Sequence, residues 1–463
     1  MPVYSISHVE NVRVCVVMVG LPARGKSLIA QKIVRYLSWL SIKSKCFNVG
    51  TYRREIAQDT ELNADFFDPT NEEGLKFRLE AVNLATVDMM KWFSEENGVV
   101  GILDATNSTK VRRDAILKLC RENFIEPMFL ESWCDDSDLI LQNIYDVKTT
   151  SPDYVDKDTE FATQDFLQRI KYYEQVYETM DEKTDPELTF IKLVNVNSQI
   201  ILNRIESYLE SRIVYYVMNL HIKPRCIWLS RHGESEFNLT GQIGGDANLS
   251  QHGWKYAKKL PELVLKSLGE ENKHTNLTVW TSTLKRTQQT SSFLPYKKKL
   301  QWKALDELDA GECDGMTYEE IEKEFPEDFK ARDDDKYEYR YRGGESYRDI
   351  VIRLEPIIME LERQENILII THQAVLRCLY AYFMNVPQEE SPWMSIPLHT
   401  LIKLEPRAYS TLVSRIKADI PAVSTYKEKG TSQLGEMEGG NISKSRDLIK
   451  DSVSEVNSVN EAK

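Results

Sequence analysis

Residues 12–27 read VRVCVVMVGLPARGKS, and this stretch decides the fold of the first half of the chain. The β-branched run Val12–Val19 predicts a buried strand, and apolar residues at helical spacing from Ser27 to Leu40 predict a helix. Between them, Gly20–Ser27 fits the pattern GxxxxGK[ST], in which backbone N–H groups turn toward a phosphate and a helix start adds positive potential. We therefore predict a phosphate-binding loop; the alternative is a chance glycine loop with a solvated lysine.

Strands and helices alternate along the rest of the chain. Further helices are expected at Glu72–Phe93 and Val111–Cys120. Further strands are expected at Cys46–Gly50, Val99–Leu103, Pro127–Leu130, Cys226–Leu229, Leu277–Trp280 and Ile367–Thr371. This alternation predicts α/β domains with parallel, doubly wound sheets.

The pattern starts again after Tyr215 without any internal sequence repeat, which indicates two different α/β domains. Lys223-Pro224-Arg225 is a plausible junction because proline breaks regular structure. From about Thr425 the chain becomes polar, so Lys427–Lys463 reads as a mobile tail. We expect domains at 1–221 and 222–425, followed by a disordered tail at 426–463.

Composition sets the class of protein. The chain has 463 residues, which favours two or three domains, and 41% hydrophobic with 28% charged residues is an ordinary globular balance. Disorder throughout, collagen and a coiled-coil rod are excluded. With 59 Lys+Arg against 72 Asp+Glu, the net charge of −13 argues against nucleic acid as a partner. Local basic clusters still permit anionic substrates.

Cysteine usage and the N-terminus predict a cytoplasmic protein. The 7 cysteines are scattered and form no CxxC pair, which indicates free thiols in a reducing compartment. Met1–Asn11 shows no signal-peptide pattern. The longest apolar run, Val14–Leu21, is far shorter than the roughly 20 residues that span a bilayer, so we expect no membrane partner.

The phosphate loop predicts a kinase. Lys26 is expected to reach the β- and γ-phosphates of ATP, and Ser27 to hold Mg²⁺. Asp104, at the end of a predicted strand, is a second candidate Mg²⁺ ligand, although it could instead cap the next helix. The guanine-specifying NKxD motif is absent. Basic residues that follow the predicted strands indicate a second anionic substrate, although each alone is more often a solvated charge: Arg53, Arg54, Arg78, Lys110, Arg112, Arg113, Lys148 and Arg169.

The second half carries a pattern for covalent phosphoryl transfer. Arg231-His232-Gly233-Glu234 directly follows a predicted strand, where open α/β sheets place their ligands. A neutral imidazole such as His232 can attack phosphorus, and it then needs cations and a proton donor nearby. Candidate partners are Arg231, Arg286, the strand-end His372 and the acid Glu307. A lone His or Glu is usually an ordinary surface or core residue, so the prediction of a histidine phosphatase rests on the combination.

The two motifs, in this order on one chain, resemble the bifunctional 6-phosphofructo-2-kinase/fructose-2,6-bisphosphatase family. The resemblance runs from about Val12 to Thr425, and the second half is also similar to phosphoglycerate mutase-like histidine phosphatases. Segments that carry it are GLPARGKS, TYRRE, ILDATN, SPDY, VYYVMN, LSRHGESEFN, GQIGGD, WTSTLKRT, ELDAG, MTYEEI, GGESY, ELERQEN and HQAV.

For the first half, the resemblance implies synthesis of fructose 2,6-bisphosphate from ATP and fructose 6-phosphate. It implies that ATP is held by Gly20, Leu21, Pro22, Ala23, Arg24, Gly25, Lys26, Ser27, Leu28, Asn143 and Lys148. It implies that fructose 6-phosphate is held by Arg53, Arg78, Thr106, Arg112, Lys148, Arg169 and Tyr173. Asp104 and Cys134 match positions near the reaction, but neither is a secure general base, since phosphoryl transfer mainly needs alignment and charge neutralisation.

For the second half, the resemblance implies hydrolysis of the same bisphosphate. His232 would take the 2-phosphoryl group, and Glu307 would protonate the leaving sugar oxygen and then help to activate water. Arg231, Arg286 and His372 would bind and polarise that phosphate. Further contacts to the bisphosphate are implied for Asn238, Gly244, Tyr318, Arg332, Lys336, Tyr347, Gln373 and Arg377. In this family the bisphosphate regulates glycolysis and gluconeogenesis, and the protein is a homodimer joined through its kinase domains.

Three positions depart from the family pattern. Lys110 replaces a common Arg, Thr371 replaces a common Cys, and Gly343 replaces a usual Lys. The tail shows no Arg-Arg-x-Ser-type site for a basic-directed kinase. Two other hypotheses are a polynucleotide end-processing kinase-phosphatase, which the net charge disfavours, and a non-catalytic phosphate-binding module. The sequence does not give the ratio of the two activities, and one domain could be feeble.

Overall fold

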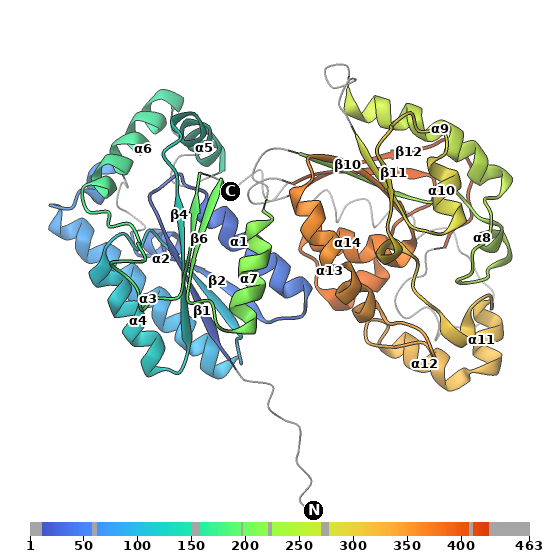
Figure 1. Cartoon of the computed structure of the whole chain (residues 1–463), viewed down its shortest axis with the longest axis horizontal. Helices are drawn as coiled ribbons and strands as arrows, with labels where there is room; N and C mark the ends of the chain where they lie inside the picture. The colour runs from blue at the N-terminus through green and yellow to red at the C-terminus, as the bar shows by residue number, and fades with distance from the viewer. Residues whose placement is uncertain are drawn as a thin grey trace, which may run out of the picture. The chain divides into compact units, whose positions relative to one another are not determined.

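The computed structural model describes residues 12–57, 63–150, 158–195, 198–220, 225–269, 277–406 and 411–425. The expected junction at 223–225 lies mostly outside this part of the chain, as does the expected tail. Residues up to Thr425 belong to one compact unit, which contains both sheets (Figure 1). The expected boundary between the first two domains, at residues 221 and 222, lies along the sequence between the last strand of the first sheet and the first strand of the second.

The first sheet has six strands in the described residues, in the order β2-β3-β1-β4-β5-β6. Strand β1 is completely buried near the centre, with β3 and β4 as parallel neighbours. The edge strand β6 runs antiparallel to β5, which the sequence did not predict. The strands are β1 (Val14–Val19), β2 (Ser44–Asn48), β3 (Val100–Asp104), β4 (Glu126–Trp133), β5 (Phe190–Val194) and β6 (Gln199–Asn203).

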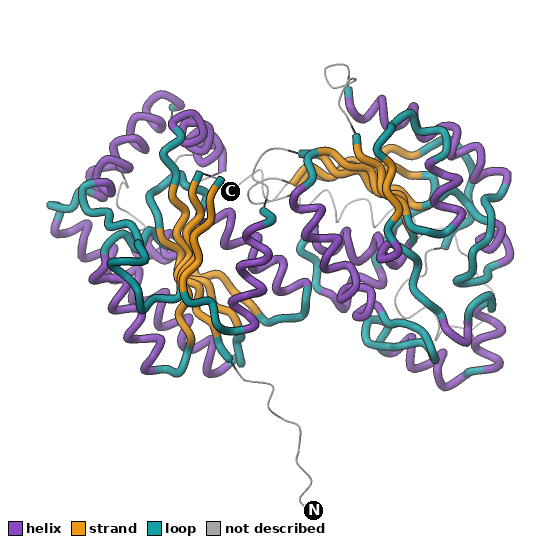
Figure 2. Tube along the Cα trace, in the orientation of Figure 1, coloured by secondary structure: helices purple, strands orange, loops and turns teal. Residues whose placement is uncertain are grey.

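Helices lie on both faces of this sheet (Figure 2). They are α1 (Lys26–Trp39), α2 (Val49–Ile56), α3 (Glu72–Glu95), α4 (Lys110–Glu122), α5 (Ser137–Thr150), α6 (Thr159–Glu174) and α7 (Tyr208–Met218). Strand β2 ends at Asn48, two residues before the predicted end, because the Asn48 side chain accepts a hydrogen bond from Thr51 N and caps α2.

The second sheet also has six strands in the described residues, in the order β12-β11-β7-β10-β8-β9. Strands β7, β10 and β8 are parallel, as predicted, and β9, which was not predicted, is a further parallel strand. Strands β11 and β12 form an antiparallel edge. The strands are β7 (Cys226–Arg231), β8 (Thr278–Thr281), β9 (Lys299–Gln301), β10 (Asn366–Thr371), β11 (Thr400–Pro406) and β12 (Thr411–Lys417). The helices are α8 (Glu236–Thr240), α9 (Gln251–Leu268), α10 (Lys285–Ser291), α11 (Tyr318–Glu324), α12 (Pro326–Asp334), α13 (Tyr347–Arg363) and α14 (Gln373–Met384).

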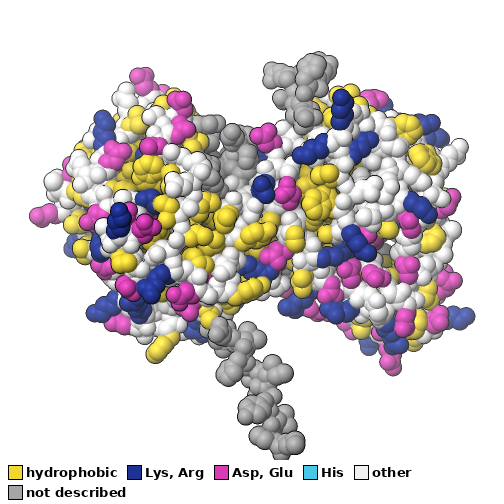
Figure 3. Space-filling model, in the orientation of Figure 1, with side chains coloured by type: hydrophobic (Ala, Val, Ile, Leu, Met, Phe, Trp, Pro, Cys, Tyr) yellow, Lys and Arg dark blue, Asp and Glu magenta, His cyan; other side chains and the backbone are white. Residues whose placement is uncertain are grey.

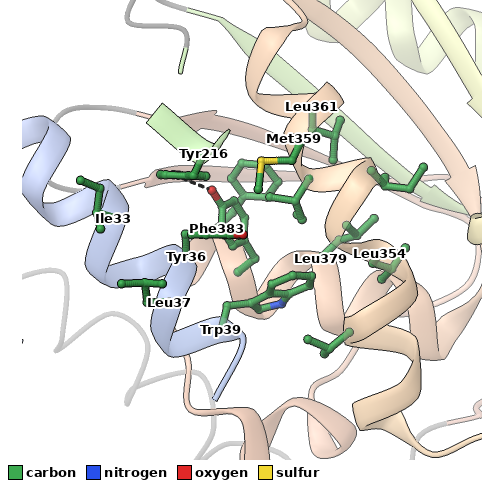
Figure 4. Packing of buried hydrophobic residues seen from close by; sticks show 14 of the residues in the cluster. Ile33, Tyr36, Leu37, Trp39, Tyr216, Leu354, Met359, Leu361, Leu379 and Phe383 are labelled. Carbon is green, nitrogen blue, oxygen red and sulfur yellow. Dashed lines mark hydrogen bonds between the residues drawn. The ribbon is translucent and has the colours of Figure 1, made fainter. Parts of the chain in front are cut away.

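One large apolar cluster joins helix α1 to helices α13 and α14 (Figure 4). Tyr36 of α1 stacks on Tyr216 of α7, with ring centroids 4.3 Å apart. Trp39, at the end of α1, donates from Nε1 to the carbonyl oxygen of Cys378 in α14 at 3.0 Å, and its ring meets the edge of Tyr382. Buried aromatic side chains of this kind contribute strongly to packing because each removes a large apolar area from water. The first helix of the kinase-like half is therefore also a packing partner of the second half.

Charges of both signs are interspersed on the molecular face in Figure 3. That face carries no continuous basic track of the kind that follows a nucleic-acid backbone. Among the described residues, no helix is both long and apolar enough to cross a membrane.

Candidate active sites

The predicted phosphate loop connects β1 to α1, at the carboxyl end of a central parallel strand. Gly20 has φ of +140°, and a Cβ atom there would lie 2.5 Å from the carbonyl oxygen of Ser132. Gly25, immediately before α1, has φ of 74°. Only glycine adopts both conformations without strain. The backbone of Gly20–Gly25 can thus curl around a phosphate at the start of α1.

Lys26 is buried at the start of α1, and its ammonium donates to the carbonyl oxygen of Leu21 at 2.6 Å. Burial lowers the pKa of Lys26 to about 7, and the carboxylate of Asp104 partly opposes this shift. An anionic phosphate at the loop would favour the charged ammonium further, because it adds negative charge nearby. The geometry suits a lysine that becomes fully charged when a phosphate binds.

Asp104 ends β3, beside the loop. Burial raises the pKa of Asp104, whereas the Ser27 hydroxyl, the Lys26 charge and the Asn48 amide oppose the increase. Asn48 donates from Nδ2 to Oδ2 of Asp104 at 2.5 Å. A serine hydroxyl next to an aspartate carboxylate is an oxygen donor set that fits Mg²⁺, which usually keeps water and phosphate oxygens as its other ligands. The metal role predicted for Ser27 and Asp104 stays a prediction that this donor set fits.

Four arginines converge on Tyr173 of α6. Burial alone would raise the pKa of the Tyr173 hydroxyl, but the guanidinium groups of Arg169, Arg78, Arg53 and Arg112 together lower it. Arg169 and Arg53 also lie against the face of the Phe67 ring, with the guanidinium carbons 3.8 Å and 5.0 Å from its centre. Four cations around one hydroxyl form a strongly positive site that suits a sugar phosphate.

Other predicted kinase residues are placed as follows. Arg24 donates from Nε to the carbonyl oxygen of Cys134 at 3.1 Å, and Asn143 donates to the carbonyl oxygen of Ala23 at 3.0 Å, so α5 and the end of β4 support the loop. The carbonyl oxygen of Thr106 accepts from Gly20 N at 3.0 Å. Burial raises the pKa of the Cys134 thiol, which disfavours a thiolate base there. The side chain of Lys148 lies outside the described part of the structure.

Other basic residues of the predicted cluster hold the backbone in place, as Arg78 also does through bonds to the carbonyl oxygens of Gly74, Phe67 and Asp68. Arg113 is buried and donates from Nη1 to the carbonyl oxygens of Asn107, Ser108 and Glu178, which fixes the loop after β3. Lys110, one of the family departures, donates to the carbonyl oxygen of Thr184 and pairs with Asp185 at 3.4 Å. Spacing alone could not separate these residues from those that surround Tyr173.

The second site forms where β7 and β10 end side by side. These parallel neighbours pair Arg231 with Thr371, so the next residue on each strand is a histidine. His232 donates from its backbone N–H to the carbonyl oxygen of Thr371 at 2.9 Å. The rings of His232 and His372 have centroids 5.2 Å apart. The sheet register thus brings together two histidines that are 140 positions apart in the sequence.

Hydrogen bonds assign the proton of each imidazole. His232 Nδ1 lies 2.7 Å from the carbonyl oxygen of Gly233, which only accepts, so Nδ1 carries the proton and Nε2 keeps a lone pair. Arg286 donates from Nε to Nδ1 of His372 at 3.2 Å, so His372 carries its proton on Nε2 and donates it to Ser282 Oγ at 2.7 Å. Burial, followed by the charges of Arg286 and nearby groups, holds the pKa of both histidines well below 6.5.

The predicted acid, Glu307, sits at the start of α14. Its two carboxylate oxygens accept from the backbone N–H groups of Gln373 at 3.0 Å and Ala374 at 3.2 Å. Arg231 and Arg286 are both buried, and the charge of Glu307 acts on the pKa of each. His232, His372, Arg231, Arg286 and Glu307 therefore belong to one electrostatic cluster, as predicted.

Further residues that were predicted to contact the bisphosphate have polar or aromatic partners of their own. Arg332 donates to the hydroxyls of Tyr341 and Tyr318 at 2.9 Å and 3.1 Å, and Arg377 donates to the Tyr347 hydroxyl at 3.0 Å. Lys336 lies 4.3 Å from the centre of the Trp393 ring. These cations suit a second phosphate on the same ligand.

Two predicted contact residues also have local roles. Asn238 Oδ1 accepts from Ser235 N and so completes the capping box at the start of α8, whose N-cap residue is Ser235. Gly244 has φ of +70°, and a Cβ atom there would collide with Asp314, whose carboxylate accepts from Gly245 N at 2.8 Å. The Gly245 carbonyl in turn accepts from Arg286 at 2.7 Å, so this loop holds a guanidinium of the cluster in place.

Sequence analysis missed three residues that support the second site. Ser282 Oγ accepts the Nε2 proton of His372 at 2.7 Å, His399 accepts a hydrogen bond from Glu234 N at 3.0 Å, and Thr425 Oγ1 accepts from Arg231. Ser282 lies within the quoted segment WTSTLKRT, which was the available signal for it. Of the family departures in this half, Thr371 donates to the carbonyl oxygen of Leu305, and Gly343 adopts φ of 67°.

Comparisons with known proteins match both halves of the chain. Residues 3–224 match the 6-phosphofructo-2-kinase family, and residues 227–419 match branch 1 of the histidine phosphatase superfamily. A Saccharomyces cerevisiae protein named fructose-2,6-bisphosphatase is 64% identical over 448 residues, which cover 97% of this chain and 98% of that protein. A 6-phosphofructo-2-kinase/fructose-2,6-bisphosphatase from Aquarana catesbeiana is 49% identical over 92% of this chain and 89% of its own length.

Solved structures that resemble the chain include a putative alpha-ribazole-5'-P phosphatase from Escherichia coli. It is 22% identical, with a TM-score of 0.38, and the match covers 44% of this chain and all of that one. The two family matches and the near full-length relatives carry the assignment. The chain belongs to the 6-phosphofructo-2-kinase/fructose-2,6-bisphosphatase family.

Proposed function

We propose that this chain is bifunctional: its first half makes fructose 2,6-bisphosphate from ATP and fructose 6-phosphate, and its second half hydrolyses that product. The observation that carries the hydrolase is the imidazole of His232, whose Nε2 carries no proton. Its ring centre lies 5.2 Å from that of His372, and the charges of Arg286 and Arg231 act on it. The kinase rests on the phosphate loop and the four arginines around Tyr173.

Hydrolysis would proceed in two displacements. His232 Nε2 attacks the phosphorus of the 2-phosphate, a P–N bond forms, and the bond from phosphorus to the sugar oxygen breaks. Glu307 supplies the proton that the leaving oxygen needs. Water then attacks the phosphohistidine, Glu307 takes a proton from that water, and inorganic phosphate leaves with Nε2 restored. Arg231 and Arg286 stabilise the charge on the transferred group in both steps.

Synthesis would be a single displacement. The 2-hydroxyl of fructose 6-phosphate attacks the γ-phosphorus of ATP, the bond from that phosphorus to the β–γ bridging oxygen breaks, ADP leaves, and the hydroxyl proton is released to solvent. Lys26 and the loop amides hold the transferred phosphate, while Arg53, Arg78, Arg112 and Arg169 fix the sugar phosphate. Ser27 and Asp104 would hold Mg²⁺, which neutralises charge on the β- and γ-oxygens.

The names of the relatives leave the kinase less supported than the phosphatase. The Saccharomyces cerevisiae relative is named for the phosphatase alone, whereas the Aquarana catesbeiana relative is named for both activities. Our proposal of both activities rests on this chain's own residues, because Lys26, Ser27, Asp104 and the arginine cluster are all present.

The test uses the full chain and two variants. Lys26→Ala should lose synthesis and keep hydrolysis, whereas His232→Ala should lose hydrolysis and keep synthesis. Labelled ATP with fructose 6-phosphate reports synthesis, and fructose 2,6-bisphosphate labelled in the 2-phosphate reports both hydrolysis and an acid-labile phosphoprotein. Each variant is the control for the other, since the lesions lie in different halves.

Contrary results would separate the claims. Hydrolysis that survives in His232→Ala would exclude the covalent mechanism. Synthesis that is absent from both the unmodified chain and His232→Ala would limit the function to the phosphatase.

We also propose a cytoplasmic homodimer that contacts itself through the kinase half. In support, the edge strand β6 exposes Leu202, and helix α7 exposes Tyr208, Tyr215 and Met218. Apolar side chains next to an unpaired strand edge suit a second copy of the same surface. Light scattering on the full chain and on Leu202→Glu would measure this directly, with a monomer expected for the variant.

A further inference from the structure

A short segment after β12 reaches the phosphatase site without belonging to any recognised motif. We call Ala418–Thr425 the C-terminal strap. Ala418 N donates to the carbonyl oxygen of His399 at 2.8 Å, and Val423 N donates to Oε2 of Glu234 at 2.9 Å. The strap is therefore attached at two points before it reaches Thr425.

One anchor, Glu234, belongs to the loop that carries His232, and the other, His399, precedes β11 and is hydrogen-bonded to Glu234. Glu234 N donates to Nε2 of His399, so that histidine carries its proton on Nδ1 and donates it to the carbonyl oxygen of Ile420 at 3.2 Å. Oε1 of the buried Glu234 accepts from Ser250 Oγ at 2.7 Å, and the ring of Tyr256 stacks on His399 with centroids 4.8 Å apart. Packed rings and paired polar groups fix the path of the strap.

The end of the strap binds a phosphatase guanidinium. Arg231 donates from Nη1 to Thr425 Oγ1 at 2.7 Å and to the carbonyl oxygen of Ile396 at 3.0 Å. These two bonds use both hydrogens of Nη1. Arg231 Nε, in contrast, is buried with no acceptor among the described residues. A guanidinium has five N–H donors, so the edge that contains Nε remains for a bidentate contact to phosphate.

We propose that Thr425 is a positioning residue of the phosphatase site, which holds Arg231 so that its Nε edge faces the transferred phosphate. The inference rests on the proposed phosphatase function. The carbonyl oxygen of Thr425 also lies 3.5 Å from Nε2 of Gln373, another predicted substrate contact. The alternative is that the Thr425 hydroxyl occupies the position of the phosphate and so inhibits hydrolysis. The second acceptor on Nη1, Ile396, favours positioning, since that nitrogen already binds the protein on both hydrogens.

The test compares Thr425→Val, which keeps the shape and removes the hydroxyl, with Thr425→Ser, which restores it. Ser424→Ala, at the exposed neighbouring position, is the matched control. Steady-state hydrolysis of fructose 2,6-bisphosphate gives kcat and KM, and calorimetry with inorganic phosphate gives its Kd. We expect Thr425→Val to weaken phosphate binding and raise KM by about tenfold, the usual effect of losing a hydrogen bond to a charged group. Thr425→Ser and Ser424→Ala should match the unmodified chain, and synthesis should be unchanged in all three.

Each result decides the question. Unchanged KM and phosphate Kd in Thr425→Val would show that the strap only packs against the site. Faster hydrolysis or tighter phosphate binding in this variant would show that Thr425 inhibits the site. Loss in Thr425→Val that Thr425→Ser fails to restore would indicate a general distortion and overturn the proposal. If the unmodified chain hydrolyses nothing, the proposed function fails, whereas the phosphate Kd values still test the role of Thr425.

Discussion

The two histidines of the phosphatase site carry their protons on opposite nitrogens. A carbonyl oxygen takes the proton of His232 Nδ1, and a guanidinium donates to His372 Nδ1. One ring therefore offers a lone pair at Nε2, and the other offers a bound proton there. A single neighbouring donor or acceptor makes this difference, so the chemistry of each ring depends on its partner as much as on its own type.

At this scale we predict an unusual pH dependence. Burial and the charges of Arg286 and Arg231 hold the pKa of His232 well below 6.5. A lowered pKa means that the neutral, nucleophilic form persists as the pH falls through 6.5, and that the protonated form appears only at lower pH. Nitrogen NMR of histidine-labelled protein should show His232 neutral at pH 6. In Arg286→Gln the titration should move up toward the ordinary value; a midpoint near 6.5 in the unmodified chain would contradict this account.

The junction of β1 and α1 depends on two glycines with different requirements. A Cβ atom at Gly20 would collide with the backbone oxygen of Ser132, whereas one at Gly25 would meet nothing within 4 Å. Both have positive φ, at 140° and 74°. A side chain at Gly20 would therefore cause both a steric clash and backbone strain, whereas one at Gly25 would cause backbone strain alone.

The matched pair Gly20→Ala and Gly25→Ala tests this distinction. Both variants are strained by about 1–3 kcal/mol, but Gly20→Ala must also move the end of β4. We expect ATP binding to fall at least tenfold in Gly25→Ala and further in Gly20→Ala, as measured by calorimetry. Hydrolysis of fructose 2,6-bisphosphate should be unaffected in both. Equal ATP affinities for the two variants would show that the contact with Ser132 has no effect.

Across the whole molecule, one buried carboxylate joins the two halves. Glu362 of α13 accepts from Lys32 and Arg35 of α1, each at 3.1 Å, from Arg225 at 2.7 Å, and from the Tyr382 hydroxyl at 2.7 Å. Its side chain is fully buried. Burial would raise the pKa of Glu362, but the charges of Lys32, Arg225 and Arg35 hold it well below its ordinary value.

Glu362→Gln should therefore destabilise the fold strongly. Removing one partner of a buried ion pair typically costs about 3–5 kcal/mol, because the remaining charges lose their compensation. The exposed Glu365→Gln nearby is the control and should change the free energy of unfolding by less than about 0.5 kcal/mol. Urea unfolding measures both. Since the folded pKa is lowered, the contribution is present above the ordinary value of 4.5 and declines as the pH falls below it. Equal stabilities at pH 7 would contradict this role.

Local patterns predicted most of the scaffold. Val14–Val19 and the helix after it follow from apolar periodicity, and the glycines of the loop follow from its motif. The antiparallel edges at β6 and β11–β12 were missed because the partner and direction of a strand depend on contacts with distant segments, which local periodicity does not encode. Thr425 and His399 were missed for another reason: they are ordinary residues until the strap folds back 194 positions onto Arg231.

The packing of Trp39 against α14 bears on how this two-domain protein can evolve. Helix α1 begins in the phosphate loop and ends by bonding to the carbonyl oxygen of Cys378, on the helix that starts beside His372. Deleting the N-terminal half would expose to water the aromatic rings of the C-terminal half that pack against it. A protein of this family that lost phosphoryl transfer from ATP would therefore still need its N-terminal half for packing. The presence of the kinase domain in a family member is thus weak evidence that the domain is catalytically active.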